Sequence, residues 1–291
     1  MRLVSFSRSS STIHTGVVVE GGIVDLTLAG LPDDMTELIR LGESGLQAAR
    51  DAAGSSKPLA FEGLRIHAPI PHPPKNVMCV GRNYLEHAAE FSQSGFDASE
   101  RSMVPEHPII FTKAPTSIIG PDEAIVVAND PTGTVDYEGE LAVVVGPGGR
   151  RVSDARALEH VYGYTIVNDV TARDLQKRHV QWYIGKSPDT FCPMGPVLVT
   201  ADELPDIAGS WLRTRVNGEL RQEGEISTLI FDIPTLIETI SGSISLEPGD
   251  IIATGTPPGA GIGFEPPRFL SPGDTVEVSV DGIGTLRNPV T

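Results

Sequence analysis

Acidic residues alternate in one short stretch, VDYEGELAVVV (residues 135–145), whose second half is an aliphatic run typical of a buried strand. Side chains two positions apart in a strand point to the same face, so Glu138 and Glu140 should project together. Two adjacent carboxylates that lead into a core repel each other and lose hydration, and a hard divalent cation would remove both penalties. The same pattern also fits a solvated hairpin end, and this stretch alone does not separate the two.

A third acid, Asp169, ends another apolar stretch, YTIVND (residues 164–169). It could complete a three-carboxylate set with Glu138 and Glu140. Hard oxygen ligands favour Mg²⁺, Mn²⁺ or Ca²⁺ over zinc, and three protein ligands leave roughly half of an octahedral shell for water and substrate. Alternatively, Asp169 caps the helix expected over residues 172–177.

Basic and amide side chains follow this third acid. Arg173 and Gln176 share a face of the expected helix, one turn beyond Asp169. A guanidinium and an amide beside a metal would suit a carboxylate substrate. Lys186 stands between apolar and small residues in IGKS, where the alternative interpretation is a solvated surface lysine.

A histidine and a carboxylate are spaced three residues apart in NYLEHAAE (residues 83–90), which has the pattern of a helix start. His87 and Glu90 can therefore touch on one helix face. A carboxylate that orients an imidazole is a general-base arrangement. A helix-surface pair without a function is the alternative.

The chain that must position these residues has a boundary at a proline-rich segment, APIPHPP (residues 68–74). This segment cannot be helix or central strand. Before it, short strands with a Gly21-Gly22 turn precede a helix expected over residues 34–53. The inward positions expected for that helix are Leu38, Leu41, Leu46 and Ala49. We therefore expect a small N-terminal α+β domain at 1–70 and a catalytic domain at 71–291.

Strands dominate from residue 108 onward, with short helices expected at 172–180 and 234–241 and a hairpin turn at Asn217-Gly218. No alternating βαβ pattern is present, so the sequence predicts a β-rich α+β fold. Residues 91–107 are polar and irregular but include Phe91, Phe96 and Met103. A loop of this length is either a lid over a site or an insertion without a role.

Composition excludes several classes of protein. The chain has 291 residues and a net charge of −16, with no run of basic residues, which disfavours nucleic-acid binding. No apolar run is long enough to span a membrane, and the N-terminus lacks the apolar core of a secretory signal. The two cysteines, Cys79 and Cys192, lack metal or disulfide spacing and are interpreted as small buried residues. A reducing cytoplasmic location is expected.

Taken together, these segments resemble the fumarylacetoacetate hydrolase family. The matching stretches are CVGRNYLEHAAE (79–90), DYEGELAVVVG (136–146), YGYTIVNDVTARDLQK (162–177), IGKSPDTFCPMGP (184–196), RVNGELRQ (215–222) and DIIATGTPPG (250–259). They occur in the family's order and extend across nearly all of residues 75–291. The chain is most similar to bacterial two-domain members described as oxaloacetate decarboxylases, acylpyruvate hydrolases or 2-hydroxyhepta-2,4-diene-1,7-dioate isomerases.

The resemblance implies a mixed β-sandwich roll behind a small N-terminal domain, and a homodimer. It implies that Glu138, Glu140 and Asp169 hold Mg²⁺ or Mn²⁺, and that His87 and Glu90 form a water-activating dyad. Lys186 would be catalytic and would also contact substrate. The other positions that match substrate-binding residues of the family are Arg173, Gln176 and Thr256. The tyrosine-degrading founder has a further aspartate ligand before its histidine, and GRNYLEH (residues 81–87) contains no aspartate.

The expected activity is divalent-metal-dependent cleavage of a C–C bond in a 2-oxo acid, by hydrolysis of an acylpyruvate or by decarboxylation of an oxaloacetate-type acid, through a stabilised enolate. One alternative is an enol–keto tautomerase or isomerase of a related dicarboxylic acid, which needs only proton transfer at the same enolate. Another is a non-catalytic binding module on the same fold.

Overall fold

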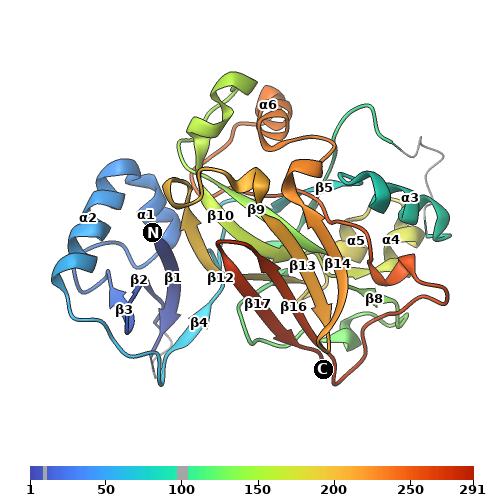
Figure 1. Ribbon diagram of the computed structural model, residues 1–291, viewed down its shortest axis with the longest axis horizontal. Coiled ribbons are helices and arrows are strands. Elements are labelled where there is room, and N and C mark those ends of the chain that lie inside the picture. The colour runs from blue at the N-terminus through green and yellow to red at the C-terminus, as the bar shows by residue number, and fades with distance from the viewer. Residues whose placement is uncertain (9–11, 97–103) are drawn as a thin grey trace.

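A mixed eleven-stranded sheet forms the centre of the protein (Figure 1), in the computed structural model, which describes residues 1–8, 12–96 and 104–291. Its strand order is β3-β2-β1-β12-β10-β9-β15-β5-β6, with β4 paired to β1 and β7 paired to β12. The strands are β1 (Arg2–Ser7), β2 (His14–Val19), β3 (Gly22–Asp25), β4 (Arg65–His67), β5 (Val77–Gly81), β6 (Ile109–Lys113), β7 (Ile118–Ile119), β9 (Gly139–Val145), β10 (Val161–Asn168), β12 (Cys192–Thr200) and β15 (Ile251–Ala253).

A four-stranded antiparallel sheet, β14-β13-β16-β17, lies against the central sheet. Its strands are β13 (Trp211–Val216), β14 (Glu219–Glu225), β16 (Thr275–Val280) and β17 (Gly284–Pro289). A further two-stranded pair joins β8 (Val135–Asp136) to β11 (Thr171–Ala172). The predicted strand-rich α+β fold is confirmed, as is the Asn217-Gly218 turn between β13 and β14, where both residues have positive φ.

Strand β9 is buried on both faces and joins two apolar cores. Leu141 and Val143 belong to the core that includes side chains of the second sheet, such as Leu212 of β13. Ala142 and Val144, on the opposite face, pack in the core that includes the N-terminal helices. The aliphatic run therefore makes β9 a rigid support for the carboxylates that stand at its start.

The helices lie at the outside of the sheets (Figure 1). They are α1 (Met35–Arg40), α2 (Gly42–Ser55), α3 (Leu85–Gln93), α4 (Arg173–His179), α5 (Tyr183–Lys186) and α6 (Ile233–Ser243). The helix expected over residues 34–53 is instead two helices that meet at Gly42, which has φ 57°. Leu41 consequently points outward and is exposed, which corrects its expected inward position, and Leu46 is only half-buried. Leu38 and Ala49 are buried as predicted.

The N-terminal strands continue the central sheet, because β1 pairs with β12 through Arg2↔Val199 and Leu3↔Leu198. The division into domains at residues 70 and 71 stays a prediction. No helix in the described part of the chain is long and apolar enough to cross a membrane.

The two sheets approach each other so closely that no room is left for a side chain at Gly139, between Glu138 and Glu140. A Cβ on Gly139 would lie 2.3 Å from Thr214 Oγ1 and 2.8 Å from Val278 Cγ1, both on the second sheet. We expect Gly139→Ala to lower the free energy of unfolding by about 1–3 kcal/mol through overpacking. Chemical denaturation would measure this loss. Gly242→Ala is the control: its Cβ meets nothing within 4 Å in α6, so it should be neutral or raise stability by roughly 0.5–1 kcal/mol.

Candidate active site

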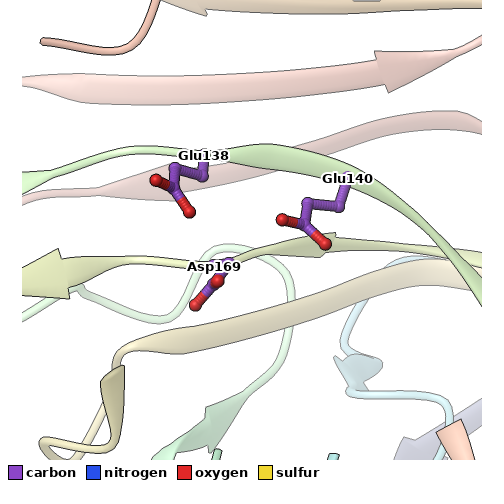
Figure 2. A group of neighbouring side chains, drawn as sticks. All are labelled: Glu138, Glu140 and Asp169. Carbon is purple, nitrogen blue, oxygen red and sulfur yellow. The ribbon is translucent and has the colours of Figure 1, made fainter. Parts of the chain in front are cut away.

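The three predicted acids meet where β9 begins and β10 ends. In the antiparallel pairing Glu140 lies opposite Val167, and the backbone N–H of Asp169 donates to the carbonyl of Glu138 at 2.7 Å. One carboxylate oxygen from each of Glu138, Glu140 and Asp169 lies within 4.8 Å of the others. Figure 2 shows the two glutamates side by side on one strand, with Asp169 facing them from the next. The predicted grouping is confirmed as geometry.

All three carboxylates are buried, which removes the alternative of a solvated hairpin end. The capping alternative for Asp169 is also wrong, since Ala172 is the N-cap residue of α4. The Asp169 side chain instead accepts hydrogen bonds from two lysines, Lys113 and Lys186. Buried charged side chains thus surround the three acids.

Lys186 lies between two of the acids. Its Nζ donates to Glu138 Oε2 at 2.6 Å and to Asp169 Oδ2 at 2.5 Å, and the side chain is 2% exposed. The surface interpretation of this lysine is therefore wrong. Burial lowers the pKa of Lys186, but the charges of Asp169 and Glu138 outweigh burial and raise it above its usual value. The ammonium thus remains charged inside the site.

Arg173 is buried between Asp136 and Glu138. Its Nε donates to Asp136 Oδ2 at 2.9 Å, and its Nη2 forms an ion pair with Glu138 Oε1 at 2.6 Å. Asp136 also accepts the backbone N–H groups of Gly261 and Ile262, at 2.7 and 3.1 Å. Arg173 therefore orients Glu138, and Asp136 orients Arg173.

Sequence reasoning missed Lys113, at the end of β6. Its buried ammonium donates to Asp169 Oδ1 at 2.6 Å, to the carbonyl of Val170 at 3.0 Å and to the carbonyl of Lys186. Lys113 therefore fixes both the Asp169 side chain and the backbone of Lys186. The available signal was a lysine that ends the apolar strand IIFTK directly before Ala114-Pro115.

Glu140 has a different environment from Glu138. Burial favours the neutral form of Glu138, but Arg173 and Lys186 lower its pKa well below the usual range. Burial, together with Asp169 and Glu138, raises the pKa of Glu140 well above its usual value. The backbone N–H of Gly255 donates to Glu140 Oε2 at 2.9 Å. Glu140 is thus the acid that most needs an added positive charge.

The donor set fits a divalent cation. Four buried carboxylates, those of Asp136, Glu138, Glu140 and Asp169, face three buried cationic side chains, Lys113, Arg173 and Lys186. One negative charge is left uncompensated within this cluster. Three carboxylate oxygens within 4.8 Å of each other are the hard ligands that Mg²⁺ and Mn²⁺ prefer.

His87, on helix α3, lies between the carboxylates of Glu90 and Glu138. Its Nδ1 is 3.6 Å from Glu90 Oε2, and its Nε2 is 3.9 Å from Glu138 Oε1. Both distances exceed a hydrogen bond. Glu90 instead accepts the backbone N–H of Gly259, at 2.9 and 3.0 Å for its two oxygens. The structure thus brings His87 and Glu90 together, with the imidazole turned toward the acidic group.

The remaining predicted contacts also lie at the site. Gln176 is buried and accepts from Arg173 Nη1 at 3.3 Å. The hydroxyl of Thr256 donates to the carbonyl of Gly139 at 2.8 Å and accepts from Gln222 Nε2 at 2.8 Å. Gln222, which the sequence did not single out, also accepts the Gly139 N–H at 3.0 Å and so ties the second sheet to β9.

A pocket lies over these groups. Three aromatic rings form part of its wall, together with the acids, the histidine and three cationic side chains. The lining residues are Val80, Gly81, Arg82, His87, Phe91, Phe111, Glu138, Glu140, Arg173, Gln176, Trp182, Lys186 and Thr256. The predicted substrate residues Arg173, Gln176, Lys186 and Thr256 thus share one cavity with His87, and what they bind stays a prediction.

The segment expected over residues 91–107 is partly well packed. Phe91 is buried in α3 against Ala260 and Ile262, and Phe96 makes an edge contact with Phe269 at 6.0 Å between ring centroids. Phe91 therefore belongs to helix α3, and the expected irregular loop does not begin at this residue. Residues 97–103, including Met103, lie outside the described residues, so the lid stays a prediction.

Comparison with known proteins assigns the family. The fumarylacetoacetate (FAA) hydrolase C-terminal family matches residues 76–291. The chain belongs to this family. Among curated relatives, it is 48% identical to oxaloacetate tautomerase YisK of Bacillus subtilis (strain 168) over 272 residues, which cover 90% of this chain and 88% of that protein. It is 40% identical to the mitochondrial oxaloacetate tautomerase fahd2 of Xenopus laevis over 298 residues, covering 100% and 90%.

A solved relative extends the likeness to the fold. The maleylpyruvate hydrolase of Sphingobium sp. SYK-6, in complex with manganese(II) ion and pyruvate, has a TM-score of 0.81 and 28% identity, and the match covers 100% of this chain and 99% of that one. The chain is thus a fumarylacetoacetate hydrolase family enzyme with a buried Glu/Glu/Asp group suited to a divalent metal.

Proposed function

We propose that this protein is a divalent-metal-dependent enol–keto tautomerase of oxaloacetate or a closely related 2-oxo dicarboxylic acid. The observation that carries the proposal is the 48% identity to an oxaloacetate tautomerase over 90% of the chain, combined with a buried carboxylate–lysine–histidine site. This ranks tautomerisation above the C–C cleavage that the sequence alone favoured. Two sequence relatives, one bacterial and one from a frog, carry the same activity in their names.

Glu138, Glu140 and Asp169 would hold Mg²⁺ or Mn²⁺, and the manganese in the maleylpyruvate hydrolase supports this choice. When bound, the cation would act as a Lewis acid toward the 2-oxo acid. Tautomerisation moves one proton between the C2 oxygen and C3 and breaks no carbon–carbon bond.

The protein's own residues would do the rest. Lys186, charged and buried between Glu138 and Asp169, would place a positive charge beside the enolate oxygen. His87 Nε2 faces Glu138 and lines the pocket, so the imidazole can exchange the proton with C3. The aromatic wall would exclude water from the enolate.

C–C bond hydrolysis is the second candidate, and the His87–Glu90 pair favours it. A carboxylate 3.6 Å from an imidazole could orient that base to activate water once substrate closes the gap.

The homodimer implied by the family resemblance is also part of the proposal, with sedimentation analysis as its measurement.

The test of the function uses enol-oxaloacetate prepared in an aprotic solvent and diluted into buffer, where the loss of enol absorbance is followed. We expect the Mg²⁺-loaded protein to accelerate this loss and EDTA to abolish the acceleration. Acetylpyruvate tested in parallel would reveal hydrolysis. Rapid acetylpyruvate cleavage, with enol loss no faster than in buffer, would contradict the tautomerase.

Replacing the imidazole tests its role in proton transfer. We expect His87→Ala to lower kcat for ketonisation by about 10²–10⁴-fold, the usual contribution of a general acid–base group. Glu90→Gln should reduce kcat much less, because Glu90 lies beyond hydrogen-bond distance from the ring and is held by Gly259. Steady-state kinetics of both variants give the comparison. Equal losses would mean that Glu90 itself takes part in the proton transfer.

A further inference from the structure

The backbone pairing between β9 and β15 ends just before the acidic cluster. The N–H of Thr254, directly after β15, still donates to the carbonyl of Leu141 at 2.9 Å. Gly255 then leaves the ladder with φ 110°, and its N–H donates to the carboxylate of Glu140 instead. Backbone groups two residues apart in a strand face the same edge, so the N–H and carbonyl of Gly139 come next along this edge of β9.

Two side chains supply the next pair of ladder hydrogen bonds. Gln222 Oε1 accepts the Gly139 N–H at 3.0 Å, and the hydroxyl of Thr256 donates to the Gly139 carbonyl at 2.8 Å. Gln222 Nε2 closes the ring, because it donates to Thr256 Oγ1 and to the carbonyl of Pro257, both at 2.8 Å. A side-chain amide carries the same acceptor and donor as a peptide group, so Gln222 does here what a neighbouring strand does elsewhere in the sheet.

The direction of each hydrogen bond in this ring is determined by its partners. The Gly139 N–H can only donate, so it must face Oε1 of Gln222. Nε2 can only donate, so the Thr256 hydroxyl accepts from it and gives its own proton to the Gly139 carbonyl, which can only accept. A flipped amide would place donor against donor at Gly139 and acceptor against acceptor at Pro257. Gln222 therefore holds the glycine in one orientation only.

The second sheet fixes the position of Gln222. The residue is fully buried on β14 and lies opposite Thr214 of β13 in the register of that sheet. Thr214 also packs on Gly139, since a Cβ at the glycine would lie 2.3 Å from Thr214 Oγ1. One cross-strand pair thus contacts the single residue that separates Glu138 from Glu140. The spacing of these two carboxylates consequently depends on a sheet that carries neither of them.

We propose that Gln222 is a positioning residue for the divalent-metal site: its amide fixes the backbone of Gly139 and thereby sets the separation of the Glu138 and Glu140 carboxylates. The inference rests on the metal site of the proposed function and deepens it, because it adds a residue of the second sheet that acts through the backbone. Side chains that hold metal ligands in place are worth about 10–100-fold in metal affinity.

Binding of Mn²⁺ tests this independently of turnover. Gln222→Met keeps a side chain of similar size and removes the amide, and we expect calorimetry to show Mn²⁺ affinity lowered by about 10–100-fold. At saturating Mn²⁺ the electron paramagnetic resonance spectrum of the bound ion should change too, because the carboxylates no longer keep their spacing. Ser241→Ala is the matched control: this buried hydroxyl in α6 accepts the N–H of Val152 at 2.9 Å, outside the pocket. Its loss should lower stability and leave Mn²⁺ affinity and spectrum as in the wild type.

Thr256→Val removes the other half of the ring and serves equally if Gln222→Met does not fold. It should also weaken Mn²⁺ binding, and the double variant should lose less than the product of the two single losses, because both side chains act on one glycine. Wild-type Mn²⁺ affinity and spectrum in folded Gln222→Met, wild-type affinity in Thr256→Val, or an equal loss of affinity in Ser241→Ala would each overturn the assignment.

Failure of the proposed function has a different signature. Wild-type protein that binds Mn²⁺ and does not accelerate ketonisation would overturn the tautomerase alone and leave the role of Gln222 to the binding data. Wild-type protein that binds no Mn²⁺ would overturn the metal site and this inference together.

Discussion

Glu140→Gln should lose metal binding and activity together while its fold stays intact. The amide oxygen can still accept the Gly255 N–H, so the local hydrogen bond survives. The substitution removes the one acid whose charge is least compensated, because burial, Asp169 and Glu138 all raise the pKa of Glu140. We expect Mg²⁺ affinity to fall at least ~100-fold, since even residues that only support metal ligands are worth about 10–100-fold. Calorimetric titration and the ketonisation rate measure the two effects.

Glu138→Gln is the matched control, because it separates metal binding from folding. Glu138 is ion-paired to Arg173 and Lys186, so its neutralisation leaves two buried cations short of a partner. We expect the metal-free Glu138→Gln protein to lose about 3–5 kcal/mol of stability, whereas metal-free Glu140→Gln should be as stable as the wild type or more so. Wild-type Mg²⁺ affinity in Glu140→Gln would refute the three-carboxylate site.

Lys113→Met should destabilise the metal-free protein about as strongly as Glu138→Gln. It removes the ammonium from Asp169 Oδ1 and from two backbone carbonyls, in a position without solvent exposure. Breaking a buried ion pair by removing one partner costs about 3–5 kcal/mol, and chemical denaturation of the metal-free protein would measure it. Lys57→Met, at an exposed position before the boundary segment, should change stability by less than about 0.5 kcal/mol. A loss for Lys113→Met as small as that of the control would mean that Lys113 does not hold Asp169.

Local periodicity made the acidic group predictable. Glu138 and Glu140 are two positions apart at the start of an aliphatic strand, and Asp169 directly follows the strand that pairs with it. The antiparallel register then brings all three together. The i, i+3 spacing of His87 and Glu90 was equally informative, because both lie on one turn of α3.

Contacts that depend on distant segments could not be predicted in this way. Lys113 reaches Asp169 across 56 residues, and no local pattern distinguishes it from a lysine that ends an exposed strand. Phe91 is buried by Ala260 and Ile262, far along the chain. The predicted inward position of Leu41 was wrong for a local reason. Gly42 adopts a left-handed conformation and ends a helix that periodicity alone would continue.

The choice between tautomerisation and C–C cleavage depends on where the proton goes after the enolate forms. The measurement that tests it most directly is NMR of oxaloacetate in D₂O with Mg²⁺-loaded protein, which follows deuterium entry at C3 and release of pyruvate in the same sample, against Mg²⁺ alone. A tautomerase should accelerate deuterium entry strongly and leave pyruvate release at the rate of the protein-free control. Pyruvate released as fast as deuterium enters, at a rate above that control, would contradict the account and identify a decarboxylase.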